Sequence, residues 1–220
     1  MNQDIIKQQQ AEWDKKWSKI SDPIAETEYA REVYQYLEDK KCHTLLDLGC
    51  GDGRDSFFFA QNKYAVTAVD FSSVSLHLLK KRLEDSPTSN LKYINSNIAE
   101  LDLKNESFDV IFANLSLHYF DDKTTSAIFD NLYSILNKDG YLFVRCKSTD
   151  DFLYGKGEKL EDNVYVKGGK VRHFFDTDYL QNKLSKFNLL EINTEESEHL
   201  MMDKNVVISS FVKAIAQKSH

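Results

Sequence analysis

Apolar and polar positions along the chain follow two periods, one typical of helices and one typical of buried strands. Residues 26–38 place Tyr29, Val33 and Leu37 on one face, which predicts a helix. Residues 44–48 form a short apolar run that stops at a glycine cluster, as expected for a strand covered on both faces. The same reasoning predicts helices over about 54–62, from Ser72–Ser73 and from Asp121 or Asp122, and strands over 65–70, 91–94, 108–113 and 141–146.

The last third of the chain is patterned less regularly. Periodicity weakens after residue 147, and glycines stand at 155, 157, 168 and 169. Asp176 is then expected to cap a short helix. Two further runs, over about 188–194 and 206–213, predict a closing hairpin. The segment 148–176 is therefore expected to be an insertion beside the regular elements.

Alternating strands and helices predict an α/β fold with a mostly parallel sheet and helices on both faces. No repeat or linker divides the sequence, so a single domain is expected over residues 1–220. Ligands of such sheets bind beyond the carboxyl ends of the strands. Residues 47–53, Asp70, Asn97 and residues 114–119 all follow predicted strands, and we expect them along one rim of the sheet.

The composition of the chain is that of a globular protein without a membrane-spanning segment. The 220 residues are 41% hydrophobic and 29% charged, as in ordinary globular proteins, and no apolar run approaches the ~18 residues that span a bilayer. The first residues lack the features of a signal peptide, so the expected localisation is cytoplasmic.

A net charge of −7 argues against nucleic acid or membrane as a partner. The sequence leaves a monomer and a homodimer open. Three cysteines without ligand spacing predict no metal site.

A glycine-rich loop, Asp47-Leu48-Gly49-Cys50-Gly51-Asp52-Gly53, directly follows the first strand and opens a helix. The GxGxG spacing alone is a weak signal for a nucleotide site. A dinucleotide pyrophosphate needs GxGxxG and an electropositive helix N-terminus, and Asp47 and Asp52 would repel it. These carboxylates favour a positively charged ligand such as S-adenosylmethionine (SAM), which carries an ammonium and a sulfonium. A nucleotide-dependent oxidoreductase is the alternative that this loop disfavours.

Two further candidates for nucleoside binding follow the second and third strands. Asp70 can accept two hydrogen bonds from a ribose diol, or it can cap the helix that begins near Ser72. Asn97 and Ile98 can present an amide and an apolar side chain to an adenine ring, or they can form a plain loop. With the glycine loop, these residues occur in the order that a nucleoside site on one rim requires.

The stretch LLDLGCGDGRDSFFFAQNKYAVTAVDFS resembles the cofactor-binding signature of class I SAM-dependent methyltransferases. Within it, DLGCGDGR and YAVTAVD are especially similar to the small tellurite-resistance and thiopurine-type bacterial methyltransferases. The resemblance implies a Rossmann-like three-layer sandwich with a seven-stranded sheet of order 3-2-1-4-5-7-6 and an antiparallel last strand. It extends from about Trp13 to the closing strands, although only residues 44–72 are highly specific.

The resemblance also implies a role for each matching residue. Asp47 and Gly49 would lie near the methionine part of the cofactor, Asp70 at the ribose and Asn114 near the methionine ammonium. The full set expected at the cofactor is Trp13, Trp17, Asp47, Gly49, Cys50, Gly51, Gly53, Arg54, Asp70, Phe71, Asn97, Ile98 and Asn114. Because Trp13 and Trp17 share one helix face, residues 1–22 are either a lid over the cofactor or a helix that simply packs on the body.

The methyl acceptor is expected beyond the fourth strand, at residues 113–120. This segment lacks the Asn/Asp-Pro-Pro-aromatic motif of methyltransferases that act on DNA amines or protein glutamine. His118 is either a general base or a packed histidine. In the related small methyltransferases an Arg/His pair points into the acceptor site, and Arg172 and His173 match it. Strand alternation would let only one of the two face the pocket, and a hairpin with solvated basic residues is the alternative.

The predicted function is metal-independent, in-line transfer of a methyl group from SAM to a small-molecule acceptor (EC 2.1.1.-). The acceptor atom is an oxygen, nitrogen, sulfur or other soft nucleophile on an anionic or polar molecule. The candidate catalytic residues are His118, Arg172 and His173. The alternatives are a non-catalytic SAM-binding protein on the same fold and an RNA or protein methyltransferase.

Overall fold

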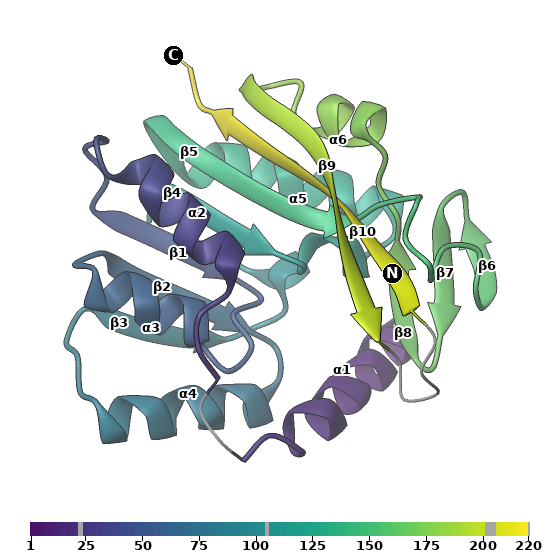
Figure 1. The fold of residues 1–220 in the computed structure, drawn as a ribbon, viewed down its shortest axis with the longest axis horizontal. Coiled ribbons are helices and arrows are strands. Elements are labelled where there is room, and N and C mark those ends of the chain that lie inside the picture. The colour runs from purple at the N-terminus through teal and green to yellow at the C-terminus, as the bar shows by residue number, and fades with distance from the viewer. Residues whose placement is uncertain (22–23, 104–105, 201–205, 220) are drawn as a thin grey trace.

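A seven-stranded sheet runs through the molecule, and a small three-stranded sheet lies beside it (Figure 1). The computed structural model describes residues 1–21, 24–103, 106–200 and 206–219, and at residues 199 and 200 it describes the backbone alone. The large sheet has the strand order β3-β2-β1-β4-β5-β10-β9. β10 is antiparallel to both of its neighbours. Counted within this sheet alone, the order is the predicted 3-2-1-4-5-7-6, and the prediction is confirmed.

The strands of the large sheet are deeply buried at its centre, where β1 contributes Leu45, Leu46 and Leu48 with no exposed surface. Such burial on both faces explains why the sequence of this strand is continuously apolar. The strands are β1 (Thr44–Leu48), β2 (Ala65–Asp70), β3 (Leu91–Asn95), β4 (Phe108–Asn114), β5 (Leu136–Lys147), β9 (Asn188–Leu200) and β10 (Val206–Gln217).

Helices cover both faces of this sheet. On one face α2 (Glu28–Leu37), α3 (Arg54–Gln61) and α4 (Ser73–Asp85) pack over Leu45 and its neighbours. On the other face α5 (Asp122–Ile135) and α6 (Thr177–Lys183) pack over Leu46 and Leu48. Alternate residues of β1 thus enter separate cores, as the pleat of a strand requires. Two short 3₁₀ turns, η1 (Ile98–Glu100) and η2 (Leu117–Tyr119), follow β3 and β4.

Three strands are longer than the sequence pattern predicts. β5 begins at Leu136 instead of Tyr141, because Leu136 pairs with Phe108 of β4 and the backbone of Asp139 and Gly140 exchanges hydrogen bonds with Lys218. β9 and β10 extend to 13 and 12 residues. Their outer halves are held by pairing with each other, for example Ser197 with Ser209, rather than by an apolar pattern.

The segment 148–176 forms the small antiparallel sheet of β6 (Glu158–Glu161), β7 (Val164–Lys167) and β8 (Lys170–His173). Gly168 and Gly169 connect β7 and β8 with φ angles of +56° and +69°. Positive φ at both central residues is the geometry of a two-residue hairpin turn, which glycine adopts without strain. This segment therefore holds a rigid hairpin where the sequence showed only weak periodicity.

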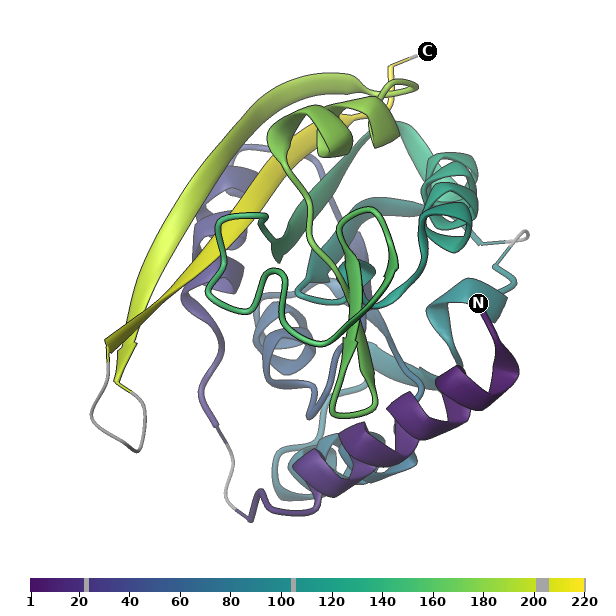
Figure 2. The same ribbon diagram turned by 90° about the vertical axis from the view of Figure 1, so that its right-hand side faces the viewer.

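The N-terminal helix α1 (Gln3–Trp17) lies outside both helical layers, beside β8 and α4 (Figures 1 and 2). The Gln10 side chain donates a hydrogen bond of 2.7 Å to the carbonyl of Phe71, and Ser72 Oγ donates one of 2.5 Å to Asp14. α1 is thereby docked beside the carboxyl end of β2. Residue 22, the end of the predicted lid segment, lies outside the described residues. In the described part of the chain, we find no helix with the length and apolar character that crossing a bilayer requires.

Candidate active site

A cavity of about 280 Å³ lies at the carboxyl ends of the parallel strands, enclosed by α1. Its size is near the lower end of the range for small-molecule pockets, about 300 Å³. Of the residues predicted to bind the cofactor, those that line the cavity are Trp13, Trp17, Gly49, Cys50, Gly51, Arg54, Asp70, Phe71, Asn97, Ile98 and Asn114. The structure thus brings together side chains from α1, the glycine loop, β2, η1 and β4.

Asp47 and Gly53 are the two predicted cofactor residues that do not line this cavity. Asp47 is 2% exposed and accepts a hydrogen bond of 2.5 Å from Ser56 Oγ. Gly53 precedes α3, and a Cβ atom at this position would lie 2.4 Å from Leu79. Both residues therefore pack on the side of the loop that faces away from the cavity.

The ring of Trp17 lies directly on the glycine loop. A Cβ atom on Gly51 would be 2.5 Å from the Trp17 ring, and Gly51 has a φ of +57°. The backbone N–H of Gly51 donates a hydrogen bond of 2.9 Å to Asp70 Oδ2. The loop is therefore shaped by β2 on one side and by α1 on the other, and only glycine leaves room for both.

Asp70 orients the backbone around the cavity as well as lining it. Its Oδ1 accepts a hydrogen bond of 2.8 Å from the N–H of Ser72, and its Oδ2 accepts the bond from Gly51. The N-cap of α4 is Ser72, whose Oγ accepts from the N–H of Ser75. The residue that caps α4 is therefore Ser72 and not Asp70. A carboxylate has lone pairs beyond the two used here, so Asp70 can accept hydrogen bonds from a ligand.

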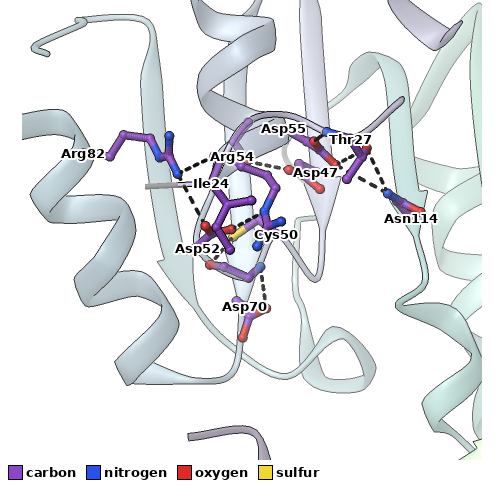
Figure 3. A network of polar contacts seen from close by, with 12 residues as sticks. Ile24, Thr27, Asp47, Cys50, Asp52, Arg54, Asp55, Asp70, Arg82 and Asn114 are labelled. Carbon is purple, nitrogen blue, oxygen red and sulfur yellow. Dashed lines mark hydrogen bonds and ion pairs between the residues drawn. The ribbon is translucent and has the colours of Figure 1, made fainter. Parts of the chain in front are cut away.

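Three buried carboxyl groups surround the glycine loop (Figure 3). Burial, with Asp55 nearby, raises the pKa of Asp47 to about 8, and burial also raises the pKa of Asp55 and Asp70. Asp55 is held by the N–H and hydroxyl of Thr27 at 2.7 and 2.9 Å. A cation bound near these carboxyl groups would stabilise their ionised form, so the site favours a positively charged ligand.

Asp52 differs from these three carboxyl groups, although the sequence argument paired it with Asp47. Its carboxylate forms ion pairs with Arg54 at 2.8 Å and with Arg82 at 3.4 Å (Figure 3). Arg82 comes from α4, so its proximity depends on the packing of that helix. Asp47, Asp55 and Asp70 form no ion pair with the described residues, so these three are the carboxyl groups that a cationic ligand would meet.

Asn114 closes the other end of the cavity. Its Nδ2 donates to Thr27 Oγ1 at 3.2 Å, whereas its buried Oδ1 has no hydrogen-bond partner among the described residues. A buried acceptor without a partner is costly, so a ligand or water is expected to supply the donor. Asn114 thus offers an acceptor in the place where the resemblance expects the methionine ammonium.

Both candidate histidines are more deeply buried than a solvent-facing general base. His118 is 1% exposed, and burial together with Lys147 and Arg172 lowers its pKa well below the usual value. His173 is 2% exposed and packs against the rings of Phe175 and Tyr179, and burial lowers its pKa to about 4. Both are neutral imidazoles at neutral pH. Neither lines the cavity, and their roles in proton transfer stay predictions.

Arg172 lies on the opposite face of β8 from His173, as strand alternation predicts. It is half-buried and makes no hydrogen bond or ion pair with the described residues, although its charge acts on Lys16, His118 and Tyr119. Lys16 lines the cavity and lies over the Trp13 ring at 4.4 Å, and burial and Lys170 lower its pKa. Arg172 does not line the cavity, so the cation that lines it on this side is Lys16 of α1, while β8 places Lys170 and Arg172 beside it.

Ten further residues line the cavity beside the predicted cofactor set. Asp52, Leu115, Ser116, Tyr119 and Phe120 lie in the segments expected at this rim. The other five are Gln9, Lys16, Thr27, Asp55 and Ser96, which no local signal in the sequence selects. Among the described residues, no group of three or more His, Cys, Asp or Glu side chains is arranged to hold a metal ion.

Comparison with known proteins relates this chain to methyltransferases. Residues 45–140 match a family model described as a methyltransferase domain. The chain is 28% identical over 199 residues to arsenite methyltransferase of Rattus norvegicus, covering 81% of this chain and 52% of that protein. It is 23% identical over 177 residues to a tRNA N(3)-methylcytidine methyltransferase of Drosophila melanogaster, covering 76% and 53%. The chain thus spans about half the length of these relatives.

The fold has close counterparts among solved structures. The structure of TehB from Haemophilus influenzae superposes with a TM-score of 0.68 at 20% identity, covering 86% of this chain and 62% of that one. At this identity the likeness establishes the fold. Residues 45–140 thus match a methyltransferase domain, and the strand order and the glycine-loop signature agree with the class I methyltransferase superfamily, whose cofactor is S-adenosylmethionine.

Proposed function

We propose that this protein transfers a methyl group from SAM to a small-molecule acceptor that carries an anionic or strongly polar group. The observation that carries the proposal is the group of three buried carboxyls, Asp47, Asp55 and Asp70, beneath a cavity that the glycine loop shapes. Their raised pKa values favour a cationic ligand. SAM supplies a methyl group already activated on a sulfonium.

The residues present fit SAM along the length of the cavity. Asp70 offers carboxylate lone pairs to a ribose diol, and Asn97 and Ile98 lie beyond it, where an adenine ring would pack. At the opposite end, the unpartnered Oδ1 of Asn114 suits an ammonium donor. The distribution of acceptors thus matches a nucleoside joined to a cationic amino-acid part.

The chain's own contribution to transfer is alignment and the exclusion of water. Trp13 packs edge-to-face on Tyr119 with ring centroids 5.2 Å apart, and Trp17 covers Gly51. These aromatic contacts join α1 to the glycine loop and to the segment after β4. A docked α1 would therefore keep water from the reacting atoms.

The acceptor is proposed to bind on the cationic side of the site. Arg172 has its guanidinium free of ion pairs with the described residues, and Lys16 and Lys170 both lie near the Trp13 ring. An unpaired guanidinium is suited to a carboxylate, phosphate or oxyanion. His118 is neutral, and its Nδ1 has no hydrogen-bond partner among the described residues. It stays the candidate for accepting a proton from the acceptor, although its buried side chain would have to be reached through the residues that line the cavity.

The names of the relatives suggest two other acceptors, arsenite and tRNA. Trivalent arsenic binds thiolates. Cys50 is the one cysteine among the described cavity residues, and burial raises its pKa well above the usual value, so the thiol stays protonated. A tRNA acceptor is disfavoured by the net charge of −7. A small anionic molecule agrees better with both observations.

The proposal is tested by incubating the protein with SAM and fractionated metabolite pools and measuring release of S-adenosylhomocysteine. We expect release with the anionic fraction and little with the cationic fraction. Release with tRNA alone would assign the RNA methyltransferase alternative. Tight SAM binding without release from any fraction would favour the non-catalytic alternative.

A further inference from the structure

Gln9 of α1 is a buried polar side chain that the sequence gives no reason to select. It is 3% exposed. Its Oε1 accepts a hydrogen bond of 2.8 Å from the N–H of Val171 in β8, and its Nε2 donates one of 3.2 Å to the carbonyl of Tyr119 in η2. Both ends of one amide thus join three segments that are far apart in the sequence.

The hairpin geometry explains why β8 needs this partner. Lys167 and Lys170 flank a two-residue turn and form its hydrogen-bonded pair, so the next pair, Val166 and Val171, is not hydrogen-bonded. The N–H of Val171 therefore points away from β7. Because Val171 is fully buried, an unpaired N–H at this position would be costly. Gln9 supplies the acceptor.

The same interface is packed closely around Gln9. A Cβ atom on Gly169, at the turn between β7 and β8, would lie 2.9 Å from Glu12 Cγ and 3.1 Å from Gln8 Cγ. The ammonium of Lys170 lies 5.1 Å from the Trp13 ring. Figure 2 shows the β7–β8 hairpin lying beside α1. The β7–β8 turn therefore packs against α1 at Gln8 and Glu12, which are one helical turn apart.

The neighbouring residue, Gln10, reaches the other half of the site. Its Nε2 donates a hydrogen bond of 2.7 Å to the carbonyl of Phe71, directly after β2. Adjacent residues of α1 thus bind the backbone on the cofactor side, through Gln10, and on the acceptor side, through Gln9. A movement of α1 would change both sides together.

We infer that Gln9 is a positioning residue that couples seating of α1 over the cofactor cavity to placement of β8 and η2 at the acceptor site. When α1 is docked, Gln9 fixes Val171 and therefore the adjacent Arg172, while it also holds the backbone of Tyr119. Cofactor binding, by stabilising the docked α1, then assembles the acceptor side. This inference rests on the proposed function, because it assigns Arg172 to the acceptor.

Hydrogen exchange of the full-length protein, with and without S-adenosylhomocysteine, tests the coupling. In the wild type we expect the ligand to slow exchange over residues 164–173 by roughly five- to tenfold, the effect of stabilising one hydrogen-bonded contact. Gln9→Met, which keeps the side-chain volume, should abolish this slowing while residues 3–17 still respond. The matched control Gln3→Met, at an exposed glutamine of the same helix, should retain it. A purely structural role of Gln9 would instead change exchange equally with and without ligand.

The inference is overturned if the ligand leaves residues 164–173 of the wild type unchanged, or if Gln9→Met responds as the wild type does. Calorimetry on the same samples separates the two proposals. If the wild type fails to bind S-adenosylhomocysteine, the proposed function is wrong, whereas binding without a response in β8 rejects the coupling alone. If Gln9→Met unfolds, Gln9→Glu replaces it. An ionised carboxylate of the same size still accepts from the N–H of Val171 but cannot donate to the Tyr119 carbonyl, so the ligand should still slow exchange over residues 164–173 and no longer slow it over residues 117–119.

Discussion

At the scale of single residues, the carboxyl groups under the glycine loop make cofactor binding depend on pH. The pKa of Asp47 is about 8, raised by burial and by Asp55, so the group is mostly protonated at neutral pH. A cation bound nearby favours the ionised form, so binding releases a proton. We therefore expect the affinity for SAM to rise with pH, by up to about tenfold per unit below pH 8. Calorimetry between about pH 6 and 8, in buffers of different ionisation enthalpy, measures both effects.

The control for this prediction is Asp47→Asn, which removes the titrating group at nearly the same size. Its affinity for SAM should vary less with pH than that of the wild type. An equally steep profile in the variant would assign the proton to another group, and a flat wild-type profile would contradict the cationic-ligand account.

The second residue-scale prediction concerns Asp70. Asp70→Ala should weaken SAM binding by about 1.5–3 kcal/mol, because hydrogen bonds to a charged acceptor are lost. Asp85→Ala, an exposed aspartate at the end of α4, should leave the affinity unchanged. Wild-type affinity in Asp70→Ala would contradict the ribose role while leaving the similarity to the methyltransferase domain unaffected.

The residues that could be predicted are those whose signal is local. Gly49, Gly51 and Asp70 follow predicted strands within one continuous motif, and the cavity contains all three. Gln9 could not be found in this way, because its partners lie 110 and 162 residues away. The ion pair of Asp52 with Arg82 could not be predicted for the same reason, since it forms only once α4 has packed.

At the scale of elements, the docking of α1 on the glycine loop can be tested by removing the space that Trp17 occupies. Gly51→Ala places a Cβ atom 2.5 Å from that ring at a φ of +57°. We expect the ring to move into water and the tryptophan emission to shift to longer wavelength. Gly155→Ala is the matched control, because Gly155 has a φ of +71° and nothing within 4 Å of its Cβ position.

Both alanine variants should carry a similar backbone cost of about 1–2 kcal/mol, measured as a loss of unfolding free energy. Gly51→Ala alone should show the emission shift and weaker SAM binding. Equal spectra in the two variants would mean that Trp17 does not rest on the loop in solution.

The packing of β8 against α6 predicts a pH dependence of stability. The folded-state pKa of His173 is about 4, against about 6.5 when unfolded, so the unfolded chain binds more protons in this interval. Burying His173 in its neutral form therefore costs nothing in the free energy of unfolding above about pH 6.5. As the pH falls toward 4, the free energy of unfolding decreases by up to about 3 kcal/mol, because the unfolded chain takes up the proton first. His173→Leu should show a smaller loss of thermal stability over this interval than the wild type. Parallel curves would contradict the buried neutral state.

Most elements could be predicted because apolar period and capping residues agree, as for the caps Ser72, Asp121 and Asp176. The small sheet could not, because its strands are short and β6 is exposed throughout, so no apolar pattern marks it. The early start of β5 depends on backbone hydrogen bonds with Lys218, which a local pattern does not record.

At the scale of the whole molecule, the chain has a net charge of −7, yet the cationic side chains of Lys16, Lys170 and Arg172 lie close together at one side of its site. In the described part of the chain none of the three forms an ion pair. If Arg172 binds the acceptor equally in the ground and transition states, Arg172→Ala should raise KM with little change in kcat. Arg31→Ala, which removes an exposed arginine of α2, is the control and should change neither constant. A fall in kcat at unchanged KM would show that Arg172 acts on the transition state instead.

The central claim is that the cavity under α1 binds SAM and not a dinucleotide. Calorimetric titration of the wild-type protein with S-adenosylhomocysteine, and separately with NADH, tests it most directly. The buried carboxyls, the acceptor of Asn114 and the glycine loop predict a single micromolar site for S-adenosylhomocysteine and no measurable heat with NADH. Binding of NADH, or the absence of S-adenosylhomocysteine binding, would contradict the account.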